Sequence, residues 1–363
     1  MNALIECPGR PAYAECIKIA AENTDAVQAF RGASILITGA SGMVGGALCR
    51  TLLYLNRTGN LGLRLLCPVR SDKSLQNLQG IAERDEVSVQ TADLADMAGL
   101  PDKIDYIVHC ASPTASAELK DRSADSLRSI CLDTFSVLEL ARKKQPKAMV
   151  YLSSMEVYGA IDGLADEDRL GFLDLSSPRS CYPAGKRMSE AACACYAQQY
   201  ALNVCTARLS QVIGAGIKPT ESRAYACFAK AALSKQAIVL KTPGTSRGNY
   251  VHISDAVRAI LFLLTHGKAG KTYNVCGDGC SCTINELARN ISKLLSDGES
   301  RVVHELPKDA SSLPYAPPTG LIMDSSRLKQ SGFRYLFTLS DMILSLGKDL
   351  SDLNDSSRKE HGE

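Results

Sequence analysis

The stretch Ser34-Ile-Leu-Ile-Thr-Gly39-Ala-Ser41-Gly42-Met43-Val44-Gly45 determines how the rest of this chain is organised. It begins as a short apolar run rich in β-branched side chains, which is typical of a buried parallel strand. The glycines then predict a turn. Apolar residues continue beyond it at helical spacing and predict a helix that buries one stripe. The stretch therefore predicts a strand, a glycine turn and a helix in direct succession.

A glycine turn that leads into a helix is a site for anions. The backbone N–H groups of the first helical turn and the positive end of the helix dipole point at the same place. We expect Gly39 to permit the tight turn, Gly42 to let a pyrophosphate approach the backbone, and Gly45 to let helix and strand pack closely. The spacing is G-x-x-G-x-x-G rather than the commoner G-x-G-x-x-G. Its position behind an apolar strand favours a dinucleotide site over a purely structural turn, with Ser41, Met43 and Val44 as further cofactor contacts.

Length and charge exclude several classes of function. A chain of 363 residues predicts two domains. Hydrophobic residues make up 45% and charged residues 22%, which is ordinary for a soluble globular protein. The net charge of +2 gives no basic footprint, so we expect no nucleic-acid partner. No apolar leader opens the chain, and no apolar run approaches the ~18 residues of a membrane span, so we expect a cytoplasmic protein with no membrane partner.

The cysteines indicate a reducing compartment and no metal. There are 14, but they are scattered, and many lie in apolar runs where a thiol packs as a small hydrophobic group. Two close pairs, Cys193-Ala-Cys195 and Cys280-Ser-Cys282, have no histidine or second cysteine pair at zinc spacing. The pattern therefore predicts no metal site.

Further apolar runs alternate with helical patterns. Strands are predicted at 63–67, 87–89, 106–110, 148–152 and 204–209, with helices between them. This β-α-β-α-β order predicts a Rossmann-type, doubly wound parallel α/β sheet. His109 lies inside the run 106–110 and is expected to be a hydrogen-bonded core residue rather than a ligand.

The end of the second strand bears on the choice of cofactor, because it meets the adenosine ribose in a dinucleotide fold. An acidic residue there would favour NAD, whereas this chain has Arg70, whose guanidinium suits a 2′-phosphate. A solvated surface arginine is the alternative, so we expect NAD or NADP, with NADP slightly favoured. Asp93 and Leu94 follow the third strand toward the adenine edge. Ala111 and Ser112 follow the fourth strand, beside the expected cofactor.

The fifth strand ends in Ser153-Ser154-Met155-Glu156, where open α/β sheets place their ligands. Downstream, Tyr182 and Lys186 lie four residues apart, and so share one face of a predicted helix. A free phenol is a poor base near neutral pH. A neighbouring ammonium is expected to lower the pKa of Tyr182 and make it a usable acid or base, while a serine hydroxyl holds the same substrate oxygen.

In these motifs and their order, residues 33–346 resemble the extended short-chain dehydrogenase/reductase family, in its epimerase/dehydratase branch that acts on nucleotide sugars. Local patterns are similar to UDP-glucuronate decarboxylases: His109-Cys-Ala-Ser-Pro, Ser154-x-Glu-Val-Tyr-Gly and Ser180-Cys-Tyr182-x-x-Gly-Lys186-Arg. The resemblance implies hydride transfer between sugar C4 and a bound nicotinamide. It implies that Ser154 positions the C4 oxygen, that Tyr182 is the acid/base, and that Lys186 tunes Tyr182 and binds the nicotinamide ribose. It also implies a homodimer built from helices near 125–144 and 182–200.

Residues next to Ser154 narrow the reaction. The family's dehydratases carry Asp and Glu there, and this chain has Met155 and Glu156. Because a thioether cannot donate a proton, 4,6-dehydration is disfavoured relative to decarboxylation or epimerisation. Glu156 is a candidate base or C5-side contact, or else a salt-bridged carboxylate at the strand end.

Two substrate contacts are expected from the same resemblance, and two positions depart from it. Gln211 stands where an asparagine usually holds substrate phosphate, and Ile130 stands where an asparagine commonly braces the site. Arg247, in the family's returning segment, is expected to bind a substrate phosphate or carboxylate, with a surface hairpin arginine as the alternative.

The expected organisation is an N-terminal helical extension (1–31), a Rossmann domain (32–210, with 250–265 returning to it), a substrate domain (211–350) and a disordered tail (351–363). The predicted function is a nucleotide-sugar-modifying enzyme that works through oxidation at C4. Two alternatives remain open: an NADPH-dependent reductase of a nucleotide-linked keto sugar, and a non-catalytic dinucleotide-binding subunit.

Overall fold

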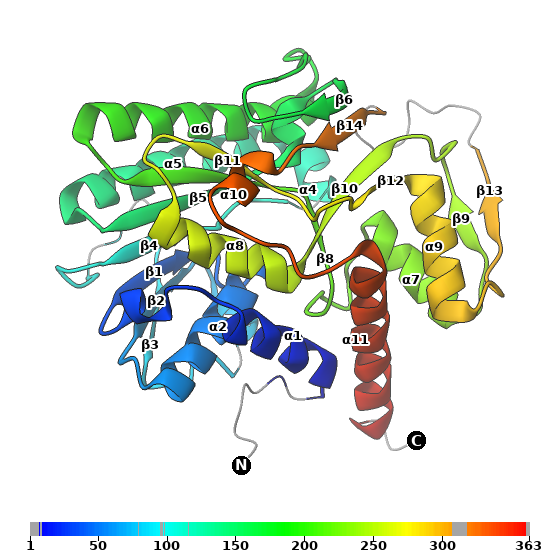
Figure 1. The fold of residues 1–363 in the computed structure, drawn as a ribbon, viewed down its shortest axis with the longest axis horizontal. Coiled ribbons are helices and arrows are strands. Elements are labelled where there is room, and N and C mark those ends of the chain that lie inside the picture. The colour runs from blue at the N-terminus through cyan, green and yellow to red at the C-terminus, as the bar shows by residue number, and fades with distance from the viewer. Residues whose placement is uncertain are drawn as a thin grey trace.

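A seven-stranded parallel sheet forms the centre of the molecule (Figure 1). The computed structural model describes residues 7, 9–78, 80–94, 97, 99–114, 116–306 and 318–360. In spatial order the strands are β3 (Val87–Thr91), β2 (Arg64–Val69), β1 (Ser34–Thr38), β4 (Tyr106–His109), β5 (Ala148–Ser154), β7 (Val204–Leu209) and β11 (Thr272–Val275). This is the strand order of a doubly wound dinucleotide-binding sheet with one further strand. The predicted Rossmann-type α/β fold is confirmed.

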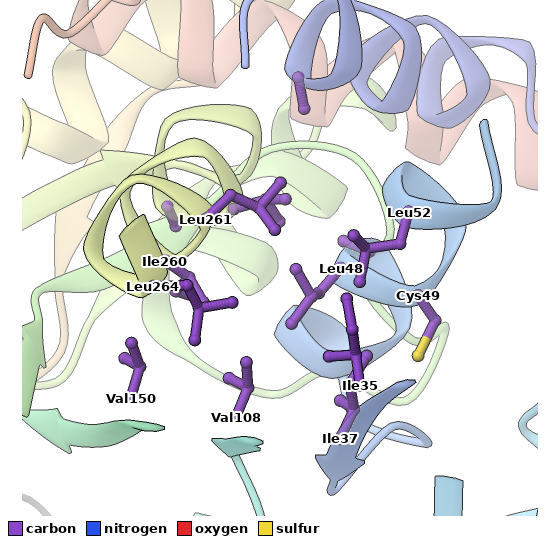
Figure 2. Packing of buried hydrophobic residues seen from close by; sticks show 14 of the residues in the cluster. Ile35, Ile37, Leu48, Cys49, Leu52, Val108, Val150, Ile260, Leu261 and Leu264 are labelled. Carbon is purple, nitrogen blue, oxygen red and sulfur yellow. The ribbon is translucent and has the colours of Figure 1, made fainter. Parts of the chain in front are cut away.

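Helices cover both faces of this sheet because alternate residues of each strand point to opposite sides. One face buries Ile35 and Ile37 of β1 together with α2 (Met43–Gly59) and α8 (Ile253–His266). Figure 2 shows these two isoleucines near Leu48 and Leu52 of α2, with side chains of α8 on the same side. The opposite face buries Leu36 of β1 against a core that includes residues of α5 (Ser123–Lys144) and α6 (Cys181–Tyr200).

A second, smaller part of the molecule is built from short strands and helices at the carboxyl end of the sheet. One three-stranded sheet has the order β12 (Ser281–Thr283), β10 (Arg247–His252), β8 (Gln211–Ile213). Two strand pairs join β9 (Ile238–Leu240) to β13 (Val302–His304), and β6 (Asp162–Ala165) to β14 (Gly320–Met323). Helices α7 (Ala224–Leu233), α9 (Ile284–Ser296) and α11 (Leu339–Glu360) share a core with this part.

Short helices complete the fold. They are α3 (Asp72–Gln76), α4 (Ser116–Asp121), α10 (Ser326–Gln330) and the 3₁₀ turns η1 (Val27–Phe30), η2 (Met155–Tyr158) and η3 (Pro178–Ser180).

The N-terminal helix α1 (Pro11–Glu22) connects the two parts of the molecule. It packs on α2, α8 and α11, and Tyr13 and Ile17 are buried among them. Just before it, Arg10 donates to the buried carboxylate of Asp349 on α11 and, at 2.9 Å, to the Ile217 carbonyl that follows β8. The segment before the first strand therefore forms part of the core between the large sheet and the smaller part of the molecule.

Two segments differ from the expected organisation. Helix α11 continues to Glu360, so residues 351–360 are helical where a disordered tail was expected; residues 361–363 lie outside the described residues. Apolar side chains on its inner face, including Leu346 and the buried Leu350, carry the helix past the predicted boundary. Strand β11, expected within the substrate domain, pairs with β7 and is the seventh strand of the large sheet.

His109 lies in the core as a hydrogen-bonded residue, as the sequence predicts. His109 is buried, with Nδ1 2.7 Å from the Thr38 hydroxyl and Nε2 3.3 Å from that of Thr134, and burial lowers its pKa to about 3. All 14 cysteines are free thiols. Within the described ranges, no helix combines the length and apolar character that crossing a membrane requires. Those ranges also hold no group of three or more His, Cys, Asp or Glu side chains placed for a metal ion.

Candidate functional site

A large cavity lies at the carboxyl ends of the parallel strands, between the large sheet and the smaller part of the molecule. Its volume is about 1120 Å³, which exceeds the usual pocket for one drug-sized ligand. It is lined by residues 39 and 41–45 of the glycine turn, by the end of β5 and the start of α6, and by β8, β10 and the loop 241–246. The cavity therefore joins the predicted cofactor, catalytic and substrate residues in one space.

The three glycines of the turn are constrained in different ways. Gly39 has φ +71°, and a Cβ there would lie 2.7 Å from the backbone N of Ala111. A Cβ on Gly45 would lie 2.3 Å from the Gly39 carbonyl oxygen, so helix and turn touch without room for a side chain. A Cβ on Gly42 would meet only that carbonyl, at 3.3 Å, and Gly42 faces the cavity. Of the three glycines, Gly42 is thus the least tightly packed.

The start of α2 leaves backbone donors at the cavity. Its first intrahelical hydrogen bond runs from the Gly46 N–H to the Gly42 carbonyl at 2.8 Å, so the amides of Met43 and Val44 precede the bonded part of the helix. Both residues line the cavity. This cradle fits the pyrophosphate of a dinucleotide, because amides and the positive helix end converge on open space.

The part of the cavity where the adenosine of a dinucleotide is expected lies along β2. Pro68, Val69, Arg70 and Ser74 line it together with Leu94. Arg70 is exposed, and its Nη1 donates to the Ser129 hydroxyl at 3.3 Å. Asp93 is exposed and is not among the lining residues, whereas Ala111 and Ser112 are. The structure thus brings all predicted cofactor residues except Asp93 to the cavity wall.

Tyr182 and Lys186 come together with Ser154 at the centre of the cavity. Lys186 Nζ lies 5.8 Å from the Tyr182 ring centre and 4.8 Å from that of Tyr151, and it donates to the Leu152 carbonyl at 2.7 Å. Tyr182 and Lys186 are buried, with 7% and 3% of their surfaces exposed, respectively. Burial lowers the pKa of Lys186 to about 8.

The expected lowering of the Tyr182 pKa is wrong. The pKa of Tyr182 is raised above its ordinary value, mainly by burial and then by the charge of Glu156. A hydrogen bond with Ser154 and the charges of Arg223 and Arg179 act in the opposite direction. Desolvation of the phenolate therefore outweighs the charges around it, and the ammonium of Lys186 is directed at a backbone carbonyl instead.

Glu156 forms an ion pair at the cavity wall. Its Oε2 lies 2.9 Å from Arg179 Nη2, and both side chains are partly exposed. Its backbone N–H donates to the Ser154 hydroxyl at 3.3 Å, which fixes the turn η2 directly behind the strand. Met155 also lines the cavity, so a thioether and a paired carboxylate follow the serine.

The far end of the cavity gathers cations from separate elements. Gln211 on β8 and Arg247 on β10 line it as expected, and Arg247 Nη1 donates to the Ser281 carbonyl at 3.1 Å. Two cations that the sequence patterns did not indicate, Arg223 and Lys241, join them, and a third, Arg179, lines the cavity beside Glu156. Arg179 lies three residues before Tyr182, so its spacing could have identified it. Arg223 and Lys241 are in loops that only the tertiary fold brings to this wall.

Ile130 fills space that supports Tyr182. It is buried with Leu119, Cys181 and Tyr182, and a Cβ added to Gly185 would lie 3.0 Å from its side chain. The position expected to brace the site through an amide therefore does so through apolar packing.

Comparison with known proteins identifies relatives of this chain. A sequence profile described as "NAD dependent epimerase/dehydratase family" matches residues 35–276. A dTDP-glucose 4,6-dehydratase of Streptomyces niveus is 27% identical over 276 residues, which cover 74% of this chain and 80% of that protein. UDP-glucuronic acid decarboxylase 6 of Arabidopsis thaliana is 27% identical over 211 residues, 57% of this chain and 60% of that protein.

A solved structure has the same fold. It is UDP-glucuronic acid 4-epimerase from Bacillus cereus, in complex with UDP-glucuronic acid and NAD. It superposes with a TM-score of 0.74 at 20% identity, covering 88% of this chain and 99% of that one. With the profile match, the Rossmann sheet and the glycine turn in agreement, the chain belongs to the NAD-dependent epimerase/dehydratase family.

Proposed function

We propose that the protein is an enzyme that modifies a nucleotide sugar through transient oxidation at C4. The observation that carries this proposal is the single cavity, which joins the glycine turn, the Ser154–Tyr182–Lys186 group and a cationic far end. The relatives are named as a dTDP-glucose 4,6-dehydratase, a UDP-glucuronic acid decarboxylase and a UDP-glucuronic acid 4-epimerase, and each name specifies a sugar linked to a nucleotide.

Each residue has a proposed role. Residues 39–45 hold the pyrophosphate of the cofactor, with Ala111 and Ser112 beside it, and a bound nicotinamide supplies the hydride acceptor and donor. Ser154 holds the C4 oxygen, and Tyr182 takes and returns the C4 hydroxyl proton. Lys186, a residue that is 3% exposed, binds the nicotinamide ribose and stabilises negative charge on the phenol.

The cationic far end supports an anionic substrate. Arg247, Arg223 and Lys241 line the wall beyond Tyr182, and guanidinium groups suit phosphate oxygens. We assign the nucleoside diphosphate to this end, with Gln211 beside it. The two parts of the molecule thus divide the ligands, the large sheet holding the cofactor and the smaller part, mainly residues 211–350, holding the sugar nucleotide.

Decarboxylation or epimerisation is favoured over 4,6-dehydration. Dehydration requires a proton donor for the leaving hydroxyl, and the thioether of Met155 offers none. Glu156 remains a candidate base, and its Oε2 lies 2.9 Å from Arg179 Nη2.

Arg70 favours NADP over NAD, since it is exposed at the adenosine end of the cavity. The same residue supports the second candidate function, net reduction of a nucleotide-linked keto sugar by NADPH.

Two further features of the whole protein are proposed. Helices α5 and α6 expose large apolar side chains, including Leu132 (49%), Phe135 (39%) and Met188 (54%), and we assign this face to a homodimer interface; sedimentation as a monomer at working concentration would contradict it. The many thiols packed as small apolar groups suit a reducing cytoplasm.

Mass spectrometry of products from a panel of UDP- and dTDP-linked hexoses and hexuronates tests the function. Loss of carbon dioxide or unchanged mass with altered retention supports the proposal. Loss of water indicates dehydration, and gain of two hydrogens with stoichiometric NADPH use indicates the reductase. Tyr182→Phe should lower kcat by roughly 10²–10⁴-fold without changing dinucleotide affinity; full activity in that variant would indicate a non-catalytic dinucleotide-binding subunit.

A further inference from the structure

A buried ion pair lies behind the proposed acid/base residues. Glu190 stands on α6 one turn beyond Lys186, and its carboxylate accepts three hydrogen bonds from Arg208 on β7. Nε donates to Oε1 at 2.9 Å and to Oε2 at 3.2 Å, and Nη2 donates to Oε2 at 2.7 Å. The side chains are only 10% and 5% exposed. Such a forked, desolvated pair fixes geometry far better than a surface pair.

The same guanidinium reaches the element that carries Ser154. Arg208 Nη1 donates to the Tyr158 hydroxyl at 3.2 Å and to the Glu167 carbonyl at 2.8 Å. Tyr158 belongs to η2, the turn that directly follows Ser154, and its own hydroxyl donates to Asn274 Oδ1 at 2.8 Å. One arginine thus connects the helix of Tyr182 and Lys186 to the strand end of Ser154.

We propose that Glu190 and Arg208 are positioning residues for the reaction: Arg208 sets the distance between the Ser154 turn and helix α6, and the Glu190 carboxylate keeps Lys186 charged. This inference rests on the proposed function, because it assigns the pair to the same Ser154–Tyr182–Lys186 group.

Electrostatics at Lys186 support the second half of the proposal. Burial lowers the pKa of Lys186 to about 8, and the charge of Glu190 is among the influences that raise it. The titratable and charged groups around this ammonium are His109 and Cys110 at the end of β4, Tyr151 of β5, and Tyr182, Glu190 and Cys193 of α6. Among them Glu190 is the carboxylate, so its neutralisation should release the proton of Lys186 at lower pH.

The experiment measures kcat and NADH affinity from pH 6 to 10 for Glu190→Gln, Glu190→Asp and Arg208→Lys. Glu190→Gln should move the alkaline loss of both quantities about one pH unit toward acid, and Glu190→Asp, which keeps the charge, should restore the wild-type position. Arg208→Lys keeps the positive charge but loses the two-nitrogen hydrogen bonding of the guanidinium to Glu190. It should lower kcat about ten- to a hundred-fold by misplacement, with the pH profile unmoved.

Glu299→Gln is the matched control, because it removes a carboxylate from an exposed ion pair with Lys235; its profile should match the wild type. Unshifted profiles in Glu190→Gln, or wild-type kcat in Arg208→Lys, would overturn the corresponding half of the inference. Should Glu190→Gln fail to fold, Glu190→Asp and Arg208→Lys still decide between charge and geometry. If Tyr182→Phe is fully active in the same assay, the proposed function itself has failed, which separates the two results.

Discussion

Gly42 and Gly45 lie three residues apart, but an added methyl group should affect them in opposite ways. In Gly45→Ala the new Cβ would lie 2.3 Å from the Gly39 carbonyl oxygen and 2.9 Å from Ala40 Cα, so the backbone must shift. In Gly42→Ala the new Cβ meets one atom, at 3.3 Å, and otherwise faces the cavity. Gly42 already has φ −84° and ψ 171°, which alanine adopts without strain.

The magnitudes follow from these contacts. Overpacking that moves backbone costs typically 1–3 kcal/mol, and alanine's better helix propensity returns about 1 kcal/mol at Gly45. Because the 2.3 Å contact is with backbone, the upper part of the overpacking range applies, and Gly45→Ala should lose about 1–2 kcal/mol of stability, or roughly 1–3 °C in Tm for a chain of this length. Gly42→Ala should stay within about 1 kcal/mol of the wild type, since only the cap preference changes. Its methyl group instead occupies the approach of the pyrophosphate, and we expect at least a tenfold weaker affinity for dinucleotide.

Thermal unfolding and a fluorescence titration with NADH measure the two effects separately. Wild-type affinity in Gly42→Ala would refute the assignment of the pyrophosphate to this turn. Wild-type Tm in Gly45→Ala would refute the argument that helix and turn touch without space between them.

Three other perturbations test separate parts of the structure. Lys186→Met should raise stability at neutral pH by about 3 kcal/mol while abolishing activity. The folded pKa of about 8 lies below the unfolded value of 10.5, so the buried ammonium destabilises the wild type below pH 8 and this cost fades as pH rises toward 10.5. Denaturant titrations should show a gain at pH 7 that falls to under about 1 kcal/mol at pH 10. Arg70→Asp should shift the ratio of NADP to NAD affinity at least tenfold toward NAD, and an unchanged ratio would place the arginine outside the ribose site. Arg10→Met leaves the buried carboxylate of Asp349 without its cation and should lower the free energy of unfolding by about 3–5 kcal/mol in denaturant titrations. Lys348→Met removes a cation from an exposed pair and should cost under about 1 kcal/mol. Equal losses of stability in the two variants would refute the role assigned to burial.

Local patterns in the sequence determined the large sheet and the cofactor turn. Each strand is a short apolar run whose alternate residues fill the two faces, as Ile35 and Leu36 do, and such patterning is visible without coordinates. The glycine turn is equally local, because φ +71° at Gly39 and the contact of Gly45 with the Gly39 carbonyl involve residues close in the chain. Tyr182 and Lys186 share one helix face, so their pairing also follows from spacing alone.

Other properties depend on residues that are far apart in the sequence, and only the tertiary structure decided them. The direction of the Tyr182 pKa shift follows from how deeply the phenol is buried, which spacing does not reveal. Arg223 and Lys241 reach the cavity from loops without a motif, and α11 extends past 351 because its inner face packs against the smaller part. Burial and long-range contact set these outcomes, since desolvation and packing act between groups brought together only by the folded chain.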